Sequence, residues 1–214
     1  MARHDAPRDS EVWACYREYL KDPNLLRDRR APANAPGREE GTLQAWLGGS
    51  SAQVALVFTD MVRSTEHLYE QETSNYMLHK RIQIVHARSL LQGVASRLVN
   101  VTGDSLFLIF RTVPDAFGFS RRFFANTGNP YVQVRIGIHY GRVTADGTGL
   151  SGRAVHYGAR VCQHGKDAEL WVSDAARGML AQDPPALEGS IEWVASEECV
   201  LKGIPDKQRL WRAA

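Results

Sequence analysis

The sequence has no block of like charges and few cysteines. Lysine and arginine total 26 and aspartate and glutamate 24, which gives a formal net charge of +2 over 214 residues. The basic residues are scattered, so nothing indicates nucleic-acid binding. Cys15, Cys162 and Cys199 are odd in number and lack Cys-x-x-Cys spacing, which argues against a disulfide framework and against a zinc site.

Long apolar runs, internal repeats and low-complexity tracts are also absent. No segment approaches the ~20 apolar residues of a membrane-spanning helix. The first residues, Met1 to Pro7, have no apolar core of the kind that secretion requires. The expectation is a cytoplasmic protein without a membrane partner, in a compartment that keeps its thiols reduced.

The N-terminal part is predicted to be a short helix followed by a linker. Trp13, Tyr16 and Leu20 recur at helical spacing after Ser10, a residue typical of helix N-caps. This face packs on its own domain or, as the alternative, binds a partner. Residues 30–41 are polar and rich in proline and alanine, which is typical of a linker.

The remaining chain suits one domain with a full core, and a second independent domain does not fit. The predicted boundaries are 1–45 for the N-terminal helical segment and linker, and 46–214 for the main domain. Its pattern predicts, in order, strand 54–58, helix 64–97, strand-turn-strand 98–110, helix 113–126, strand-turn-strand 131–146, helix 152–164, strand 170–173, helix 174–182 and terminal strands. Such an order indicates an α+β fold, with helices covering one face of a largely antiparallel sheet.

Two strand ends carry a carboxylate. The run Phe58-Thr59-Asp60-Met61-Val62-Arg63-Ser64-Thr65 closes an apolar strand with Asp60, and Asp104 follows Gly103 at a turn between two short strands. Two separated acids, each at the end of a strand, suggest a two-metal site for phosphoryl transfer. Taken singly, Asp60 also suits a helix cap and Asp104 a tight turn.

Six motifs in a fixed order resemble the class III nucleotidyl cyclases, which convert a nucleoside triphosphate into a 3′,5′-cyclic nucleotide and pyrophosphate. The motifs are Phe58-Thr59-Asp60, Gly103-Asp104, Val134 to Gly141, Gly152 to Arg160, Leu170 to Ser173 and Leu201-Lys202-Gly203. The resemblance covers about Val54 to Trp211. It implies a ferredoxin-like, palm-like domain with a mixed, mostly antiparallel sheet and helices packed on it.

The same resemblance implies roles for single residues. Asp60, Asp104 and the carbonyl of Met61 would hold two Mn²⁺ (or Mg²⁺) per active site. Arg160 matches the arginine that stabilises the α-phosphate in the transition state, and Lys202 the lysine that grips the terminal phosphates. A surface arginine and a solvated lysine are the plain alternatives. In the family the acids and these cations come from different subunits, which implies a head-to-tail homodimer.

The start of the helix after Asp60 is the candidate phosphate site. Unpaired amides of Val62, Arg63 and Ser64 and the helix dipole favour anions there, and Thr65 adds a hydroxyl. The Arg63 side chain pairs either with the triphosphate or with an acid of its own helix. Phe58 belongs to the strand and is expected to pack at the floor of the nucleotide site.

The positions that read adenine in adenylyl cyclases differ here. Asn100 replaces a lysine, Gly149 aligns with an aspartate, and His156 replaces the helix asparagine on the same helix face as Arg160. Loss of both readers forfeits adenine selectivity. Together with the signature around Asp60, this resembles the pyrimidine cyclases of the bacterial Pycsar antiphage systems, which make a cyclic nucleotide for a separate effector.

That resemblance implies UTP or CTP as the substrate, with Asn100 as the base-reading residue. Three alternatives stay open. The first is an adenylyl or guanylyl cyclase with atypical base recognition, and the second is a catalytically silent, nucleotide-binding regulatory module. The third, a palm-fold polymerase or diguanylate-forming enzyme, is disfavoured because Ser105 follows Asp104 where those enzymes carry a glycine-rich signature.

Overall fold

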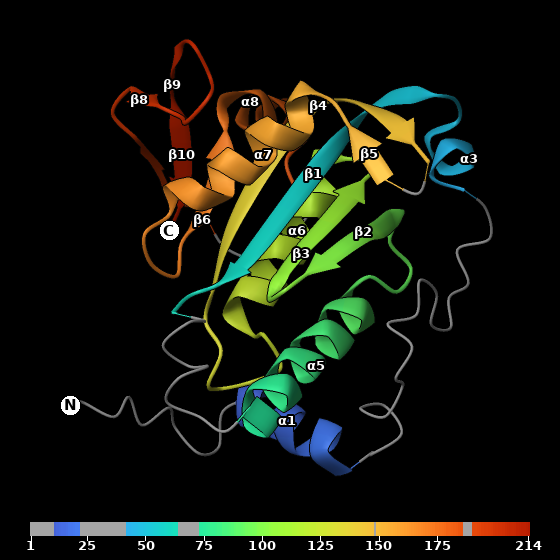
Figure 1. Ribbon diagram of the computed structural model, residues 1–214. Helices are drawn as coiled ribbons and strands as arrows, with labels where there is room; N and C mark the ends of the chain where they lie inside the picture. Colours follow the sequence, from blue (N-terminus) through green and yellow to red (C-terminus); the bar gives the residue numbers. More distant parts are fainter. Residues whose placement is uncertain (1–10, 22–41, 64–72, 148, 186–189) are drawn as a thin grey trace.

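A single mixed sheet organises the computed structural model (Figure 1), which describes residues 11–21, 42–63, 73–147, 149–185 and 190–214. The strands follow the order β2-β3-β1-β4-β6-β10-β7, with β5 paired to β4. Among the described strands every pairing is antiparallel except that of β4 with β6. Their bounds are β1 Ser51–Met61, β2 Ser96–Thr102, β3 Ser105–Phe110, β4 Val134–Asp146, β5 Gly149–Ser151, β6 Leu170–Ser173, β7 Trp193–Ala195 and β10 Leu210–Ala213, and a separate hairpin joins β8 Cys199–Val200 to β9 Lys207–Gln208.

Helices cover both faces of this sheet, and not one face as the sequence predicted. The helices are α1 Glu11–Lys21, α3 Leu43–Leu47, α5 Thr73–Leu90, α6 Val113–Ala125, α7 Arg153–His164 and α8 Asp174–Gln182. Helices α6 and α8 pack with Ile136 and Ile138 in the main core, and α7 and α3 lie on the other side (Figure 1). The α+β prediction itself is confirmed.

Gly137 explains why the second face is covered. A Cβ at this position would collide with the backbone nitrogen of Cys162 in α7, so the missing side chain lets the helix lie directly on the strand. The alternation in residues 132–138 predicts one buried face, formed by the valines and isoleucines. It does not predict that a helix also covers the glycine face.

Two predicted elements have different bounds in the structure. Helix α5 ends at Leu90, short of residue 97, because the chain turns at Gly93, whose φ is +75°. Strand β4 runs unbroken from Val134 to Asp146, where a turn was predicted inside the segment. Gly141 serves close packing there, since a Cβ on it would lie 2.7 Å from the Cβ of Ala154.

The N-terminal helix α1 packs against α5 (Figure 1). Tyr19 is 9% exposed, and its hydroxyl lies 2.9 Å from Nδ1 of the buried His86. Leu20, predicted to face the domain, is 42% exposed. The interpretation of a helix packed on its own domain therefore agrees with these contacts, but Tyr19 and not Leu20 provides the buried anchor. Ser10, the predicted cap, lies outside the described residues.

Among the described residues no helix combines the length and apolar character needed to cross a bilayer. Cys162 is buried and Cys199 is half-buried, and both are thiols outside any disulfide.

Candidate active site

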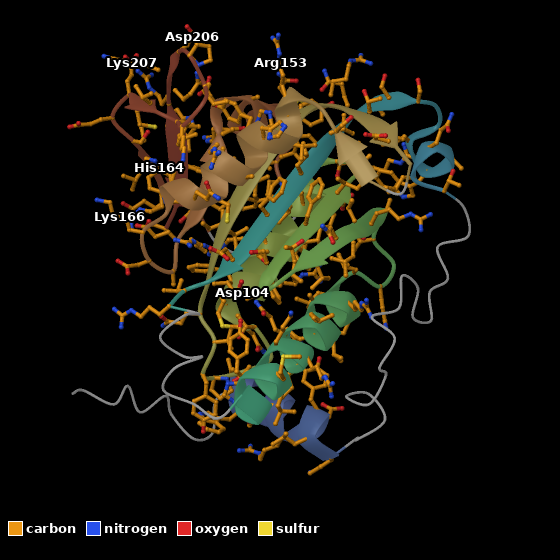
Figure 2. The ribbon with its side chains drawn as sticks, viewed as in Figure 1. Asp104, Arg153, His164, Lys166, Asp206 and Lys207 are labelled. Atoms are coloured by element: carbon orange, nitrogen blue, oxygen red, sulfur yellow. The ribbon has the colours of Figure 1, made fainter. Side chains whose placement is uncertain are left out.

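Strand pairing brings the two predicted metal acids to the same end of the sheet. Strand β1 lies between β3 and β4, and its residue Thr59 pairs with Leu106 of β3. Asp60 therefore lies next to Ser105, whose hydroxyl donates to Asp60 Oδ1 at 2.9 Å. Asp104 immediately precedes Ser105, in the two-residue turn between β2 and β3. Figure 2 shows Asp104 at the end of the sheet that faces α5.

Tyr76 of α5 lies within electrostatic range of both acids. Burial raises the pKa of Tyr76, and the negative charges of Asp104 and Asp60 raise it further. The charges of both carboxylates therefore act on the same tyrosine, at the end of the sheet that α5 approaches.

The donors at this edge fit a divalent cation. Asp104 Oδ2 is buried and has no hydrogen-bond partner among the described residues, an arrangement that costs free energy unless a cation binds there. Carboxylate and carbonyl oxygens are the ligands that Mg²⁺ and Mn²⁺ prefer. Met61 ends β1 with its side chain buried in the core, so only its backbone carbonyl is a candidate ligand. Within the described part of the chain, no cluster of three or more histidine, cysteine or acidic side chains adds to the two acids.

Arg135 is a site residue that sequence reasoning missed. It pairs directly with Asp60 in the β1–β4 register. Its Nε donates to Asp60 Oδ2 at 2.8 Å, Nη2 forms a second contact with the same oxygen, and Nη1 donates to the Gly165 carbonyl at 3.3 Å. In the sequence, Arg135 is only a polar residue of an alternating strand. A cross-strand alignment of β1 with β4 is the signal that would have revealed it.

The predicted phosphate-binding segment is only partly described. The Val62 amide is not an unpaired donor, because it donates to the Gln133 carbonyl at 2.9 Å and so extends the β1–β4 pairing past Met61. Arg63 follows with a φ of +57°, the one positive value among the described residues other than glycine. Ser64 and Thr65 lie outside the described residues, and their roles remain predictions.

A cleft of about 490 Å³ opens beside the acids. Its lining residues include Phe58, Asn100, Thr102, Ser105, Phe107 and Gly149. The Phe58 and Phe107 rings stack with centroids 4.4 Å apart, and Asn100 Nδ2 donates to Thr102 Oγ1 at 2.9 Å. Both positions that align with adenine readers, Asn100 and Gly149, thus lie on one cleft, although β3, α6 and β4 separate them in sequence.

The predicted cations lie elsewhere. Arg160, half-buried on α7, donates to Gln163 Oε1, and His156 is exposed on the same helix. Lys202 is exposed in the loop between β8 and β9. Figure 2 shows Lys207 of this hairpin at the top left of the molecule, well away from Asp104 near its middle. Within the described residues, no hydrogen bond or ion pair links Arg160 or Lys202 to the acids of the same chain.

Helix α7 packs on a half-buried histidine, His139. Burial lowers the pKa of His139 to about 4, so the ring is neutral near pH 7. Its Nδ1 lies 2.9 Å from Ser173 Oγ, and the ring stacks on Tyr157 of α7 with centroids 4.3 Å apart. This stack fixes α7, and with it Arg160, on the sheet.

Comparison with known proteins identifies the fold. No family model and no curated protein sequence matches the chain. Among solved structures, the guanylate cyclase domain of RhGC from Catenaria anguillulae, in complex with GTP, matches with a TM-score of 0.64 and 16% identity, over 76% of this chain and 96% of that one. The non-canonical dimeric guanylyl cyclase domain of RhoGC from Blastocladiella emersonii matches with 0.62 and 14%, over 75% and 95%.

Adenylate cyclases from Trypanosoma brucei, solved in their monomeric state, match with a TM-score of 0.62 and 17% identity, over 75% of this chain and 87% of theirs. The chain therefore has the fold of the class III nucleotidyl cyclase domains, a mixed and mostly antiparallel sheet with helices packed on it.

Proposed function

We propose that this chain is a nucleotidyl cyclase, which converts a nucleoside triphosphate into its 3′,5′-cyclic monophosphate and diphosphate. The observation that carries the proposal is the meeting of Asp60 and Asp104 beside the cleft that Asn100 lines. The shared fold with solved adenylyl and guanylyl cyclase domains supports it.

In this reaction the ribose 3′-hydroxyl loses its proton and its oxygen attacks the α-phosphorus. The bond from that phosphorus to the bridging oxygen breaks, and pyrophosphate leaves. Two Mn²⁺ or Mg²⁺ ions bound to Asp60, Asp104 and the Met61 carbonyl would favour the deprotonated hydroxyl and neutralise the phosphates. In this proposal Lys202 grips the terminal phosphates, Arg63 pairs with the triphosphate, and Arg160 donates to the α-phosphate.

We propose UTP or CTP as the substrate. Asn100 and Gly149 line the cleft in place of the lysine and aspartate that read adenine, and the Asn100 amide offers both a donor and an acceptor. By the resemblance to the Pycsar cyclases, the product is a messenger for antiphage defence, and it activates a separate effector protein. That role is tested by measuring cyclic UMP and cyclic CMP in cells before and after phage infection.

We propose further that the active unit is a head-to-tail homodimer with sites at the interface. The separation of Lys202 and Arg160 from the two acids within one chain supports this assembly, because one triphosphate must contact all four residues.

The test is incubation of the purified protein with each of ATP, GTP, CTP and UTP in Mn²⁺, followed by mass spectrometry of the products. An Asp104→Asn variant serves as the inactive control. Cyclic UMP or cyclic CMP as the main product supports the proposal, with cyclisation abolished in the control. Cyclisation that survives in Asp104→Asn would remove the two-metal argument.

A purine cyclase is the second candidate, since the solved neighbours include a GTP complex and adenylate cyclases. Cyclic AMP or cyclic GMP as the main product would establish it. Binding of a triphosphate without release of pyrophosphate would instead identify a silent regulatory module.

A further inference from the structure

The Asp60 carboxylate is almost fully engaged by protein donors. Arg135 Nε and Nη2 both contact Oδ2, and the Ser105 hydroxyl contacts Oδ1 at 2.9 Å. An ionised carboxylate has about four acceptor positions, two on each oxygen. The guanidinium therefore fills both positions of Oδ2, and one position on Oδ1 is left.

The two acids thus differ in how far protein donors occupy their oxygens, although both are proposed to bind metal. Asp104 Oδ2 is buried and has no partner among the described residues, whereas Asp60 Oδ2 is already bound to the guanidinium of Arg135. If the guanidinium served only to neutralise the site, it would be expected to lie between the carboxylates. It is bound to one of them alone.

The position of Arg135 is fixed at both ends. Its backbone pairs with Asp60 across β1 and β4, and its Nη1 donates to the Gly165 carbonyl at 3.3 Å. The ion pair is nevertheless accessible, with side-chain exposures of 28% for Arg135 and 23% for Asp60. A dissolved ion can therefore reach the pair without opening the core, and the arginine has solvent on one side into which it can move.

We propose that Arg135 competes with divalent ions for Asp60, so that an ion can use Oδ2 only after the guanidinium has released it. This inference rests on the proposed function, because it assumes that the two acids bind metal. Two cations cannot share the acceptor positions of one oxygen that a planar guanidinium already fills. Arg135 is thus a positioning residue that sets the metal affinity of the resting site.

The direct test is Mn²⁺ binding to the full-length protein without nucleotide, with free Mn²⁺ followed by electron paramagnetic resonance. Arg135→Gln removes the competing charge and is expected to lower the Mn²⁺ Kd by about tenfold. Arg142→Gln is the matched control, because Arg142 is exposed on the same strand and, within the described part of the chain, its hydrogen-bond partner is Ser51 Oγ, at 3.3 Å. Its Kd should equal that of the wild type.

Arg135→Lys keeps the charge but lacks the planar fork of the guanidinium, so its Mn²⁺ Kd is expected to fall between those of the wild type and Arg135→Gln. Thermal unfolding of each variant verifies that it is folded. An unchanged or higher Kd in Arg135→Gln would overturn the proposal, since the arginine would then only hold Asp60 in place for the ion.

A second measurement uses the unaltered protein. The ¹⁵N signal of the Arg135 side-chain Nε–H, assigned by its loss in Arg135→Lys, should shift as Mg²⁺ is added, while that of Arg142 stays in place. A static Arg135 signal under saturating Mg²⁺ would overturn the proposal. If the wild type binds neither Mn²⁺ nor Mg²⁺ and Asp104→Asn behaves identically, the proposed metal-dependent function fails as well. This outcome distinguishes failure of the proposed function from failure of the Arg135 proposal alone.

Discussion

Arg63 has a backbone φ of +57°, a region that costs a residue with a Cβ about 1 kcal/mol more than glycine. Backbone strain of this kind clusters at functional sites, and Arg63 lies three residues after Asp60, which motivates a test of its side chain. Arg63→Gly should raise the free energy of unfolding by up to about 1 kcal/mol, partly offset by the freer unfolded chain. It should also raise the KM for the triphosphate by about tenfold, the effect of one lost charge-assisted contact.

Arg63→Ala is the control for this prediction, measured by urea unfolding and steady-state kinetics. It removes the same guanidinium but keeps the strain, so its KM should rise equally without any gain in stability. If Arg63→Gly matched the wild type in KM, the side chain would not bind the triphosphate, and pairing with an acid of its own helix would be preferred.

Asn100 is the single residue on which the choice of base is expected to depend. It is exposed on β2 at the rim of the cleft, held by its bond to Thr102. Asn100→Lys restores the residue type that reads adenine and should shift the ratio of kcat/KM towards ATP. The measurement is competition between ATP and UTP with both products quantified. Gln92→Lys, an equal charge change in an exposed turn after α5, should leave the ratio unaltered.

At the scale of elements, the contact of α7 with β4 should depend on pH. His139 has a pKa of about 4 when folded and 6.5 when unfolded, so the unfolded chain binds more protons between these values. The contribution of neutral His139 to the free energy of unfolding is therefore fully present above pH 6.5 and is lost as the pH falls towards 4. From pH 7 to pH 5 this group should cost about 2 kcal/mol of unfolding free energy.

His139→Asn keeps a polar atom for Ser173 and removes the titration. Urea unfolding at pH 7 and pH 5 should show a smaller loss in this variant than in the wild type, by the same ~2 kcal/mol. Other groups contribute to the slope, since burial also lowers the pKa of His164, and the comparison between the two proteins isolates His139. Equal losses in both would show that His139 is not the group responsible.

At the scale of the whole molecule, a two-chain site predicts complementation. Asp104→Asn lacks one of the proposed metal acids and Arg160→Ala lacks the proposed transition-state arginine, so each homodimer should be inactive. In an equal mixture half of the dimers are mixed, and each mixed dimer contains one intact site of two. Turnover should recover to about a quarter of the wild-type value, as symmetry requires. Activity that stays at the level of either variant would argue against an interfacial site.

The local sequence pattern predicted several elements closely. Strand β6 and helix α8 have the predicted bounds, and α6 and α7 begin and end within a residue of them. Each of these is short, strongly patterned and bounded by clear signals, such as Ser173 accepting from the Ala176 amide at the start of α8. The prediction of Asp60 and Asp104 as metal ligands also starts from a local feature, a carboxylate at or just after the end of a strand, and it stays a prediction.

The features that the sequence did not predict depend on contacts between residues far apart in the chain. The sequence by itself determined the α+β class and the placing of acids and glycines along the chain, because these follow from periodicity and residue chemistry. Only the tertiary structure decided that Arg135 pairs with Asp60, that the Val62 amide is already bonded, and that Asn100 and Gly149 share a cleft. Those contacts depend on the register between strands, which no window of local sequence contains.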